Sequence, residues 1–200
     1  MNDDFIEFYV NKFCYVSSVD KADVSFITPI MRRRLSAIDK CSLFVLNNIY
    51  SEYAQNLVFS SQKGEEERLI KIINQFTEDG GVSPNTFAGS VHNYPAGFFL
   101  LNKQKSIPYN AISASTNSAA AGLLAAVASN YDNILYCYAD KNADDYCAFG
   151  INISKKSGGE AYVLKLKNSD KTDSFTDYID IFSGKKDSLE TKLFNVKRVK

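Results

Sequence analysis

The chain has 200 residues, of which 45% are hydrophobic and 23% are charged. This length and balance fit one ordinary globular domain, and they exclude a disordered, collagen-like or coiled-coil chain. Lys plus Arg and Asp plus Glu number 23 each, so the net charge is zero. The chain therefore has no overall positive electrostatic field to attract a polyanion, and we expect no nucleic-acid partner.

Targeting and redox signals in the sequence predict a cytoplasmic location. The first ten residues, MNDDFIEFYV, carry acids where a secretory signal carries bases. No stretch approaches the roughly 18 uninterrupted apolar residues of a spanning helix, so we expect no membrane insertion. The cysteines form no CxxC pair and most lie among apolar residues, which predicts reduced thiols. They are Cys14, Cys41, Cys137 and Cys147.

The first part of the chain alternates strand and helix patterns. Residues 5–16 are rich in Phe, Tyr and Val and predict a strand, and residues 56–61 form a short apolar run of the buried-strand type. Residues 32–50 and 65–76 place apolar side chains at helical spacing. This spacing predicts two helices, each following one of the strands.

The middle of the chain contains a proline-interrupted helix and a helix of small residues. Ser83 and Pro84 are typical of a helix start, and Pro95 must break or restart the helical stretch that continues to residue 101. Residues 109–113 predict a strand. The following run, 115–129, is rich in alanine, which indicates a central helix in close contact with its neighbours.

The next apolar segments complete an α/β pattern. Residues 133–138 are almost continuously apolar, as in a strand covered on both faces. Residues 146–153 and 161–167 predict two strands, and the intervening turn KKSGGE predicts that they pair as a hairpin. The order of elements indicates an α/β fold with a mixed sheet covered by helices.

The composition changes near residue 168, where NSDKTDS is typical of a loop. We therefore predict a main domain over residues 1–167 and a C-terminal extension over 168–200. Residues 178–182 are the one predicted strand of this extension, which we interpret as an accessory piece.

The sequence offers few groups for metal or acid–base chemistry. His92 is the single histidine and has no cysteine near it, so we expect no metal site and no pair of catalytic histidines. Considered alone, His92 fits a structural, hydrogen-bonded role best. Gly80-Gly81 lacks the lysine of a phosphate loop, and no nucleotide or other cofactor is predicted.

Arg32, Arg33 and Arg34 form a local basic cluster at the predicted start of a helix. Cations at this end oppose the helix dipole, so the cluster is costly unless a partner compensates it. Three interpretations fit the cluster: a solvated helix end, an intrachain pairing with carboxylates, and a docking patch for an acidic protein.

Four stretches together resemble one family. They are RRRLSAIDKCSLFVLNNI, LVFSSQKGEEERLIKII, SPNTFAGSVHNYPAGFFLL, and ISASTNSAAAGLLAAV with the following NILYCYAD. The sequence is similar to the β-ketoacyl synthase-like N-terminal domain found in short chain-length-factor-like proteins of aryl-polyene type gene clusters. The most specific signature is SP-x-x-F-x-x-SVHN-x-x-AG, carried by Ser83, Pro84, Phe87, Ser90, His92, Asn93 and Gly97.

The resemblance implies half of a thiolase-like condensing-enzyme fold. Complete enzymes of this kind carry a cysteine nucleophile at the turn into a buried central helix, and their second half supplies further catalytic residues. The matching turn here spans residues 111–118 and contains no cysteine, so Ser115 or Asn117 takes the nucleophile position. The resemblance therefore implies a subunit without condensing activity of its own.

The resemblance also implies a partner. Condensing enzymes dimerise through the strand before the nucleophile turn, and here that strand is formed by Tyr109, Asn110, Ala111, Ile112 and Ser113. We expect a heterodimer with a true ketosynthase in fatty-acid or polyketide biosynthesis. Two alternatives stay open: a small acyltransferase or acyl hydrolase that uses Ser115, and an acyl-carrier-protein binding module in which Arg32, Arg33 and Arg34 contact the acidic carrier.

Overall fold

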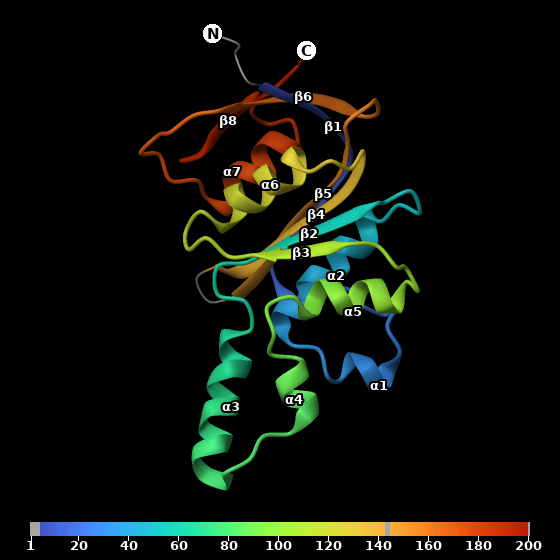
Figure 1. Ribbon diagram of the computed structural model, residues 1–200, viewed down its shortest axis with the longest axis vertical. Coiled ribbons are helices and arrows are strands. Elements are labelled where there is room, and N and C mark those ends of the chain that lie inside the picture. The colour runs from blue at the N-terminus through green and yellow to red at the C-terminus, as the bar shows by residue number, and fades with distance from the viewer. Residues whose placement is uncertain (1–4, 143–144, 200) are drawn as a thin grey trace.

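The computed structural model describes residues 5–142 and 145–199, which fold around an eight-stranded mixed sheet (Figure 1). The strand order is β3-β2-β4-β5-β1-β6-β8-β7. β2 pairs in parallel with β3 and β4, and the remaining pairs are antiparallel, so the predicted mixed sheet is confirmed. The strands are β1 (Phe5–Val16), β2 (Asn56–Ser60), β3 (Tyr109–Ile112), β4 (Asn133–Asn142), β5 (Asp145–Ser154), β6 (Glu160–Leu166), β7 (Ser188–Glu190) and β8 (Phe194–Arg198).

Helices cover both faces of the sheet and enclose two apolar cores. α2 and α5 lie on one face, and α6 and α7 lie on the other (Figure 1). Pro95 stands in the first turn of α5, so the predicted break in that helical stretch is confirmed. The helices are α1 (Pro29–Arg32), α2 (Ala37–Ile49), α3 (Glu66–Asp79), α4 (Pro84–Ala88), α5 (Tyr94–Asn102), α6 (Ser118–Ala128) and α7 (Phe175–Phe182), with a 3-10 turn at Val19–Lys21.

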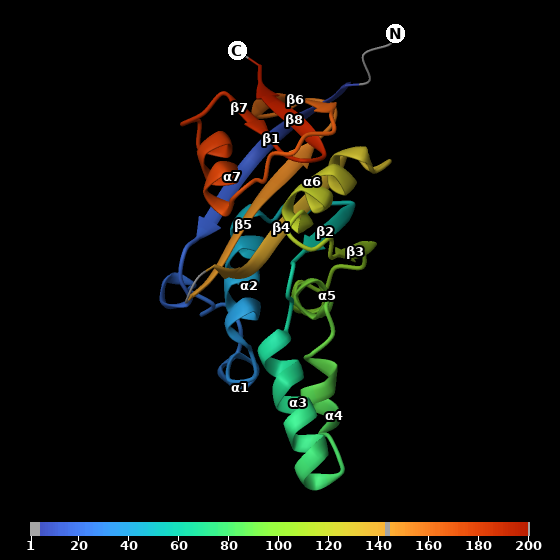
Figure 2. The same cartoon turned by 90° about the vertical axis from the view of Figure 1, so that its left-hand side faces the viewer.

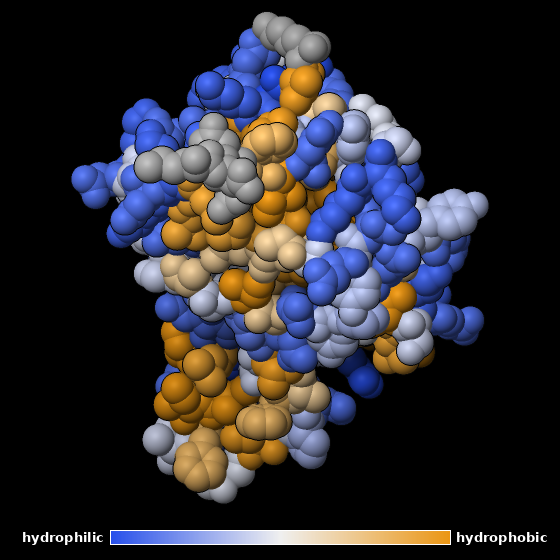
Figure 3. Space-filling model, turned by 45° about the horizontal axis from the view of Figure 1, so that its top comes forward, coloured by the Kyte–Doolittle hydropathy of each residue, from blue (hydrophilic) through white to orange (hydrophobic). Residues whose placement is uncertain are grey.

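α3 and α4 form an arm that projects away from the sheet (Figures 1 and 2). The apolar positions of α3 recur at helical spacing, as predicted, but only Ile72 among them is buried. Five large apolar side chains of the arm are between 51% and 61% exposed: Leu69, Ile70, Ile73, Phe76 and Phe87. Side chains of this character gather at the arm end of the molecule (Figure 3).

The first long helix begins later than the prediction of residues 32–50. α1 ends at Arg32, and α2 begins at Ala37 behind a capping box. The Ser36 hydroxyl accepts from the Asp39 backbone N–H at 3.1 Å, and the Asp39 carboxylate accepts from the Ser36 N–H at 3.0 Å. These bonds satisfy free donors at the helix start, so the three arginines precede this helix instead of beginning it.

The predicted hairpin of residues 146–153 and 161–167 is wrong, because β1 lies between β5 and β6. The first half of β1 pairs with β6 and its second half pairs with β5, with an irregularity between Val10 and Lys12. The other edge of β5 is occupied by β4. The turn after β5 therefore crosses β1, and the Gly159 N–H donates to the Asn11 side chain at 3.0 Å.

The predicted strand over residues 178–182 is also wrong, because this segment is part of helix α7. Ser174 and Asp177 form a capping box at its start, and Tyr178, Ile181 and Phe182 bury one side of the helix. β8 pairs with β6, so the segment after residue 167 extends the same sheet and contributes to the core around α6.

Candidate functional site

The turn into α6 is held in a sharp bend. Ser115 has a φ of 53°, in the left-handed region that serine rarely adopts. The buried Ser118 hydroxyl accepts from the Ala114 N–H at 2.9 Å and donates to the Ser115 carbonyl at 2.6 Å. As a result, Ser115 is exposed at the bend and Asn117 takes the N-cap position of α6.

His92 has a structural role next to this turn. Its Nε2 lies 3.2 Å from the Ile112 carbonyl oxygen, and a carbonyl only accepts, so this nitrogen carries the proton. The ring packs against Phe59 with 5.8 Å between centroids. A Cβ at Gly64 would come within 2.7 Å of His92 Nδ1, so this glycine leaves room for the imidazole.

Other residues of the signature also contact β3. The Asn93 side chain donates to the Tyr109 hydroxyl at 3.3 Å. A Cβ at Gly97 would lie 3.1 Å from that same hydroxyl, so the absence of a side chain lets the phenol approach α5 closely. His92, Asn93 and Gly97 thus fix the strand that precedes the Ser115 turn.

The first part of the signature forms α4 in the arm. Ser83 stands at the N-cap without a side-chain cap bond, and Pro84 takes the first turn. The Ser90 hydroxyl donates to the Phe87 carbonyl at 2.8 Å and closes the helix end, while the Phe87 ring is exposed. These residues build the arm and lie apart from the Ser115 turn.

The three arginines do not act as one patch. Arg32 folds back and donates to the Ile27 carbonyl at 3.1 Å. Arg33 lines a shallow hollow with Arg32 and Lys40, whereas Arg34 lines a different cavity at the base of the arm. The structure therefore separates Arg34 from Arg32 and Arg33.

A buried ionic cluster, which the sequence analysis missed, joins the arm to the body. Arg68 of α3 contacts the buried Asp39 carboxylate at 3.1 Å and the Glu65 carboxylate at 3.5 Å. Ser36 donates to Glu65 at 2.6 Å, and Arg68 also donates to the carbonyls of Arg34 and Gly89. One guanidinium thus connects α3 with the segments before α2 and after α4.

Two carboxyl groups share this single cation, and the proton resides on Glu65. Burial and the neighbouring Asp39 raise the pKa of Glu65 from its ordinary 4.5 to about 8. Asp39 lies closer to Arg68 and accepts from the Ser36 N–H, so it is the better anion of the pair. Protonated Glu65 can donate a hydrogen bond to Asp39.

This proton predicts that stability falls with rising pH. Unfolded Glu65 loses its proton near pH 4.5 and the folded residue near pH 8, so between these values the folded state binds more protons. The free energy of unfolding then decreases by up to about 1.4 kcal/mol per pH unit. Glu65→Gln, which imitates the protonated acid, should reduce this slope, and burial of Asp39, which raises the pKa of that carboxyl group as well, keeps its own contribution. Urea unfolding of both proteins at pH 5, 6.5 and 8 measures this pH dependence. If the free energy of unfolding of both proteins depended on pH equally, Glu65 would not carry the proton.

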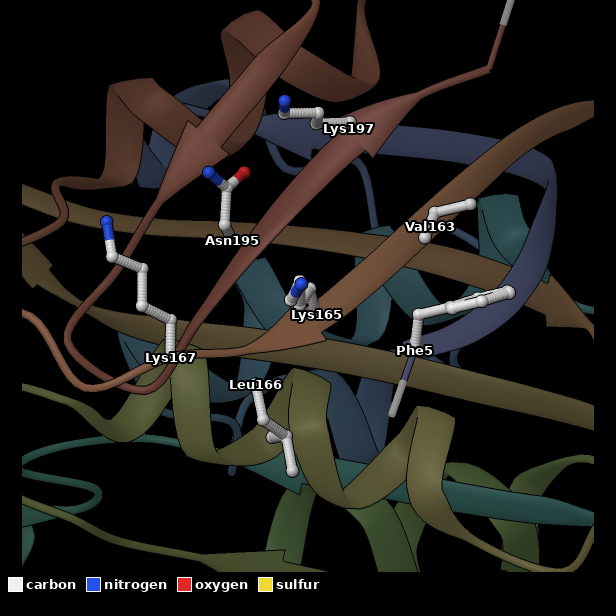
Figure 4. A pocket seen from close by; sticks show the side chains of 7 residues that line it. All are labelled: Phe5, Val163, Lys165, Leu166, Lys167, Asn195 and Lys197. Atoms are coloured by element: carbon white, nitrogen blue, oxygen red, sulfur yellow. The ribbon is translucent and has the colours of Figure 1, made fainter. Parts of the chain in front are cut away.

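A separate cavity of about 300 Å³ opens on the outer face of β6 and β8 (Figure 4). Phe5, Val163 and Leu166 supply its apolar walls, and lysines of the same strands surround them. Asn195 Oδ1, at the same cavity, is buried without a hydrogen-bond partner. No residue of the signature lines this cavity, so it is distinct from the Ser115 turn.

The cysteines are free thiols, and three of them are buried. Burial raises the pKa of Cys41 and of Cys147 to about 12 and that of Cys137 well above its usual value, so these thiols stay protonated. Within residues 5–142 and 145–199, no three His, Cys, Asp or Glu side chains gather as metal ligands would. None of the described helices combines the length and apolar character needed to cross a membrane.

The fold is similar to that of several solved structures. A chain of the ketosynthase (ApeO) in complex with its chain length factor (ApeC) from Xenorhabdus doucetiae matches with a TM-score of 0.72 and 16% identity, over 96% of this chain and 100% of that chain. The ishigamide ketosynthase/chain length factor matches with a TM-score of 0.60 and 9% identity, over 80% of this chain and 67% of that one.

A third similar structure is AntDE:AntF, a type II PKS acyl-carrier protein in complex with its ketosynthase. It matches with a TM-score of 0.60 and 9% identity, over 82% of this chain and 70% of that one. These likenesses confirm the predicted thiolase-like fold. No curated protein matches the sequence.

The family comparison covers most of the chain. Residues 11–187 match the model described as the beta-ketoacyl synthase, N-terminal domain, so the match begins within β1 and ends just before β7. The chain therefore belongs to the family of beta-ketoacyl synthase N-terminal domains.

Proposed function

We propose that this chain is a catalytically inactive, chain-length-factor-like subunit that pairs with a separate ketosynthase in polyketide or fatty-acid biosynthesis of the aryl-polyene type. The observation that carries the proposal is the turn into α6. By the resemblance to condensing enzymes, Ser115 or Asn117 of this turn takes the position of their cysteine, and residues 111–118 contain no cysteine. Two of the structural relatives are ketosynthase and chain length factor assemblies, which supports the pairing.

The chemistry around Ser115 favours a non-catalytic role. A serine hydroxyl is a weak nucleophile unless a neighbouring base accepts its proton. Among the residues that the structure describes, no side chain hydrogen bonds to the Ser115 hydroxyl, and the proton-bearing nitrogen of His92 is engaged by Ile112. These contacts give a Ser115 acyltransferase or hydrolase no activated nucleophile.

The open edge of β3 supports a strand-to-strand interface. β3 is the first strand of the sheet order and pairs only with β2. The Ile112 carbonyl accepts from Ser61 and the Pro108 carbonyl from Leu57, so in this parallel pair the backbone groups of Ala111 point to the open edge. An unpaired edge is a template for another chain.

The arm supports a further contact with the same partner. Four of its five exposed large apolar side chains lie on α3, which buries only Ile72 among its apolar positions, and the fifth, Phe87, lies on α4. Exposed apolar surface of this extent commonly marks a protein interface. We propose that the ketosynthase covers part of the arm in addition to the edge of β3.

We further propose that the complex works in the cytoplasm and meets an acyl carrier protein. The free, protonated thiols fit a reducing compartment. An acidic carrier would meet Arg33 and Lys40, which line one hollow at the surface, together with Arg32. The relative that contains an acyl-carrier protein supports this class of partner.

Replacing Ala111 by Pro should abolish the heterodimer while preserving the fold. Proline removes an N–H from the open edge, and edge strands tolerate it because no bond to β2 is lost. Ala111→Ser keeps the N–H and is the matched control, which should pair normally. Size-exclusion chromatography of each variant with the ketosynthase gives the test, and circular dichroism checks folding. A folded Ala111→Pro variant that still forms the complex would argue against this interface.

A further inference from the structure

A cavity of about 360 Å³, lined mostly by residues with polar or charged side chains, lies where the arm joins the body. Arg34 precedes α2, Arg68 comes from α3, Asn85 and Thr86 come from α4, and Tyr94 begins α5. Two stretches that the sequence analysis singled out, the arginine run and the SPNTF part of the signature, therefore meet around one cavity. The proposed contacts with a ketosynthase and a carrier protein use neither Arg34 nor the polar side chains of α4.

The cavity contains hydrogen-bond donors that are not used elsewhere. Arg34 is exposed and forms no ion pair with any residue that the structure describes. In the same described part of the chain, the Asn85 amide, the Thr86 hydroxyl and the Tyr94 hydroxyl have no hydrogen-bond partner either. Arg68, in contrast, is fixed by Asp39, Glu65 and two carbonyls, so it contributes a positive charge held in place.

The charges around the cavity leave an excess of positive charge. Arg34 and Arg68 are its two cations, and the acids packed behind Arg68 are Asp39 and Glu65. Because the pKa of Glu65 is about 8, this acid is mostly protonated at neutral pH. One carboxylate therefore opposes two guanidinium groups.

We propose that this cavity binds a small oxyanion, a phosphate or carboxylate group, with Arg34 as its principal ligand. Guanidinium groups match the geometry of both oxyanions through paired N–H donors. The Tyr94 hydroxyl and the Asn85 and Thr86 side chains supply further donors at the same cavity. A bound anion would connect the body to the arm at the level of Arg68.

Titration of the full chain with inorganic phosphate at pH 7 and constant ionic strength tests the site. Isothermal calorimetry should give saturable binding to a single site, and Arg34→Gln should weaken it about tenfold or more. Arg33→Gln, which removes the same charge from the adjacent position outside this cavity, is the matched control and should bind as the parent does. A parallel titration with acetate distinguishes a carboxylate site from a phosphate site.

Arginine side-chain and backbone amide signals in NMR spectra locate the site. As phosphate is added, the signals of Arg34 and of residues 85–89 should shift at lower phosphate concentrations than any other signals. Equal weakening in the Arg33 and Arg34 variants would show diffuse attraction and overturn the proposal. Absence of saturable binding for both anions, or binding that Arg34→Gln leaves unchanged, would overturn it as well.

Discussion

Replacing Arg68 by Gln is expected to lower the free energy of unfolding by about 3–5 kcal/mol, because it leaves buried carboxyl groups without their cation. Asp39 is fully buried and Glu65 nearly so, and Arg68 is the only cation within ion-pair distance of either among the described residues. The substitution also removes the donors to the Arg34 and Gly89 carbonyls. The arm should lose its fixed attachment to the body.

Lys71→Gln is the control for this variant, since Lys71 is an exposed cation on the same helix and should change stability by less than about 0.5 kcal/mol. Denaturant unfolding measures the free energy of unfolding of both variants. Without Arg68 the pKa values of Asp39 and Glu65 should rise further, because no cation then favours their charged forms. The loss of unfolding free energy should therefore be smaller at pH 5 than at pH 8. A loss below about 1 kcal/mol, or one that is larger at pH 5, would contradict the role given to the cluster.

Gly150→Ala is expected to cost about 3 kcal/mol, because β5 packs directly beneath α2 at this position. A Cβ at Gly150 would lie 2.7 Å from Val45, 2.9 Å from Ile49 and 2.8 Å from the Tyr136 carbonyl oxygen. The first two atoms belong to the helix and the third to the neighbouring strand's backbone, which the sheet holds in place. The added methyl group therefore fits only if α2 moves away from the sheet.

The control is Gly81→Ala, at a glycine with no other atom within 4 Å of the added carbon. Its free energy of unfolding should stay within about 1 kcal/mol of the parent, on the stabilising side. Thermal and urea unfolding of the two variants compare them directly. Equal stability of the Gly150 variant and the parent would mean that α2 packs less closely on β5 than the structure shows.

The sequence was sufficient for the elements whose pattern is local. The apolar runs that became β2 and β4 and the alanine-rich run that became α6 each carry their own signal. Capping boxes were the local signals that the interpretation overlooked. Ser36 with Asp39 marks the start of α2, and Ser174 with Asp177 marks a helix where a strand was predicted.

Pairing and charge partners depend on long-range contacts and could not be read from local patterns. β1 inserts between β5 and β6, although the residues that it pairs with lie more than 130 positions later in the chain. Arg68 meets an aspartate 29 residues earlier in the chain. The turn at Ser115 was located by resemblance, whereas its bend and the tie from His92 to β3 required the structure.

Co-expression with a cysteine-containing ketosynthase from the same genome tests the central claim most directly. The complex is isolated by size-exclusion chromatography, and condensation is assayed with and without this chain and with its Ser115→Ala variant. We predict a stable heterodimer whose activity or product length depends on this chain and is unchanged by Ser115→Ala. A chain that stays apart from the ketosynthase, or an activity that disappears with Ser115, would contradict the account.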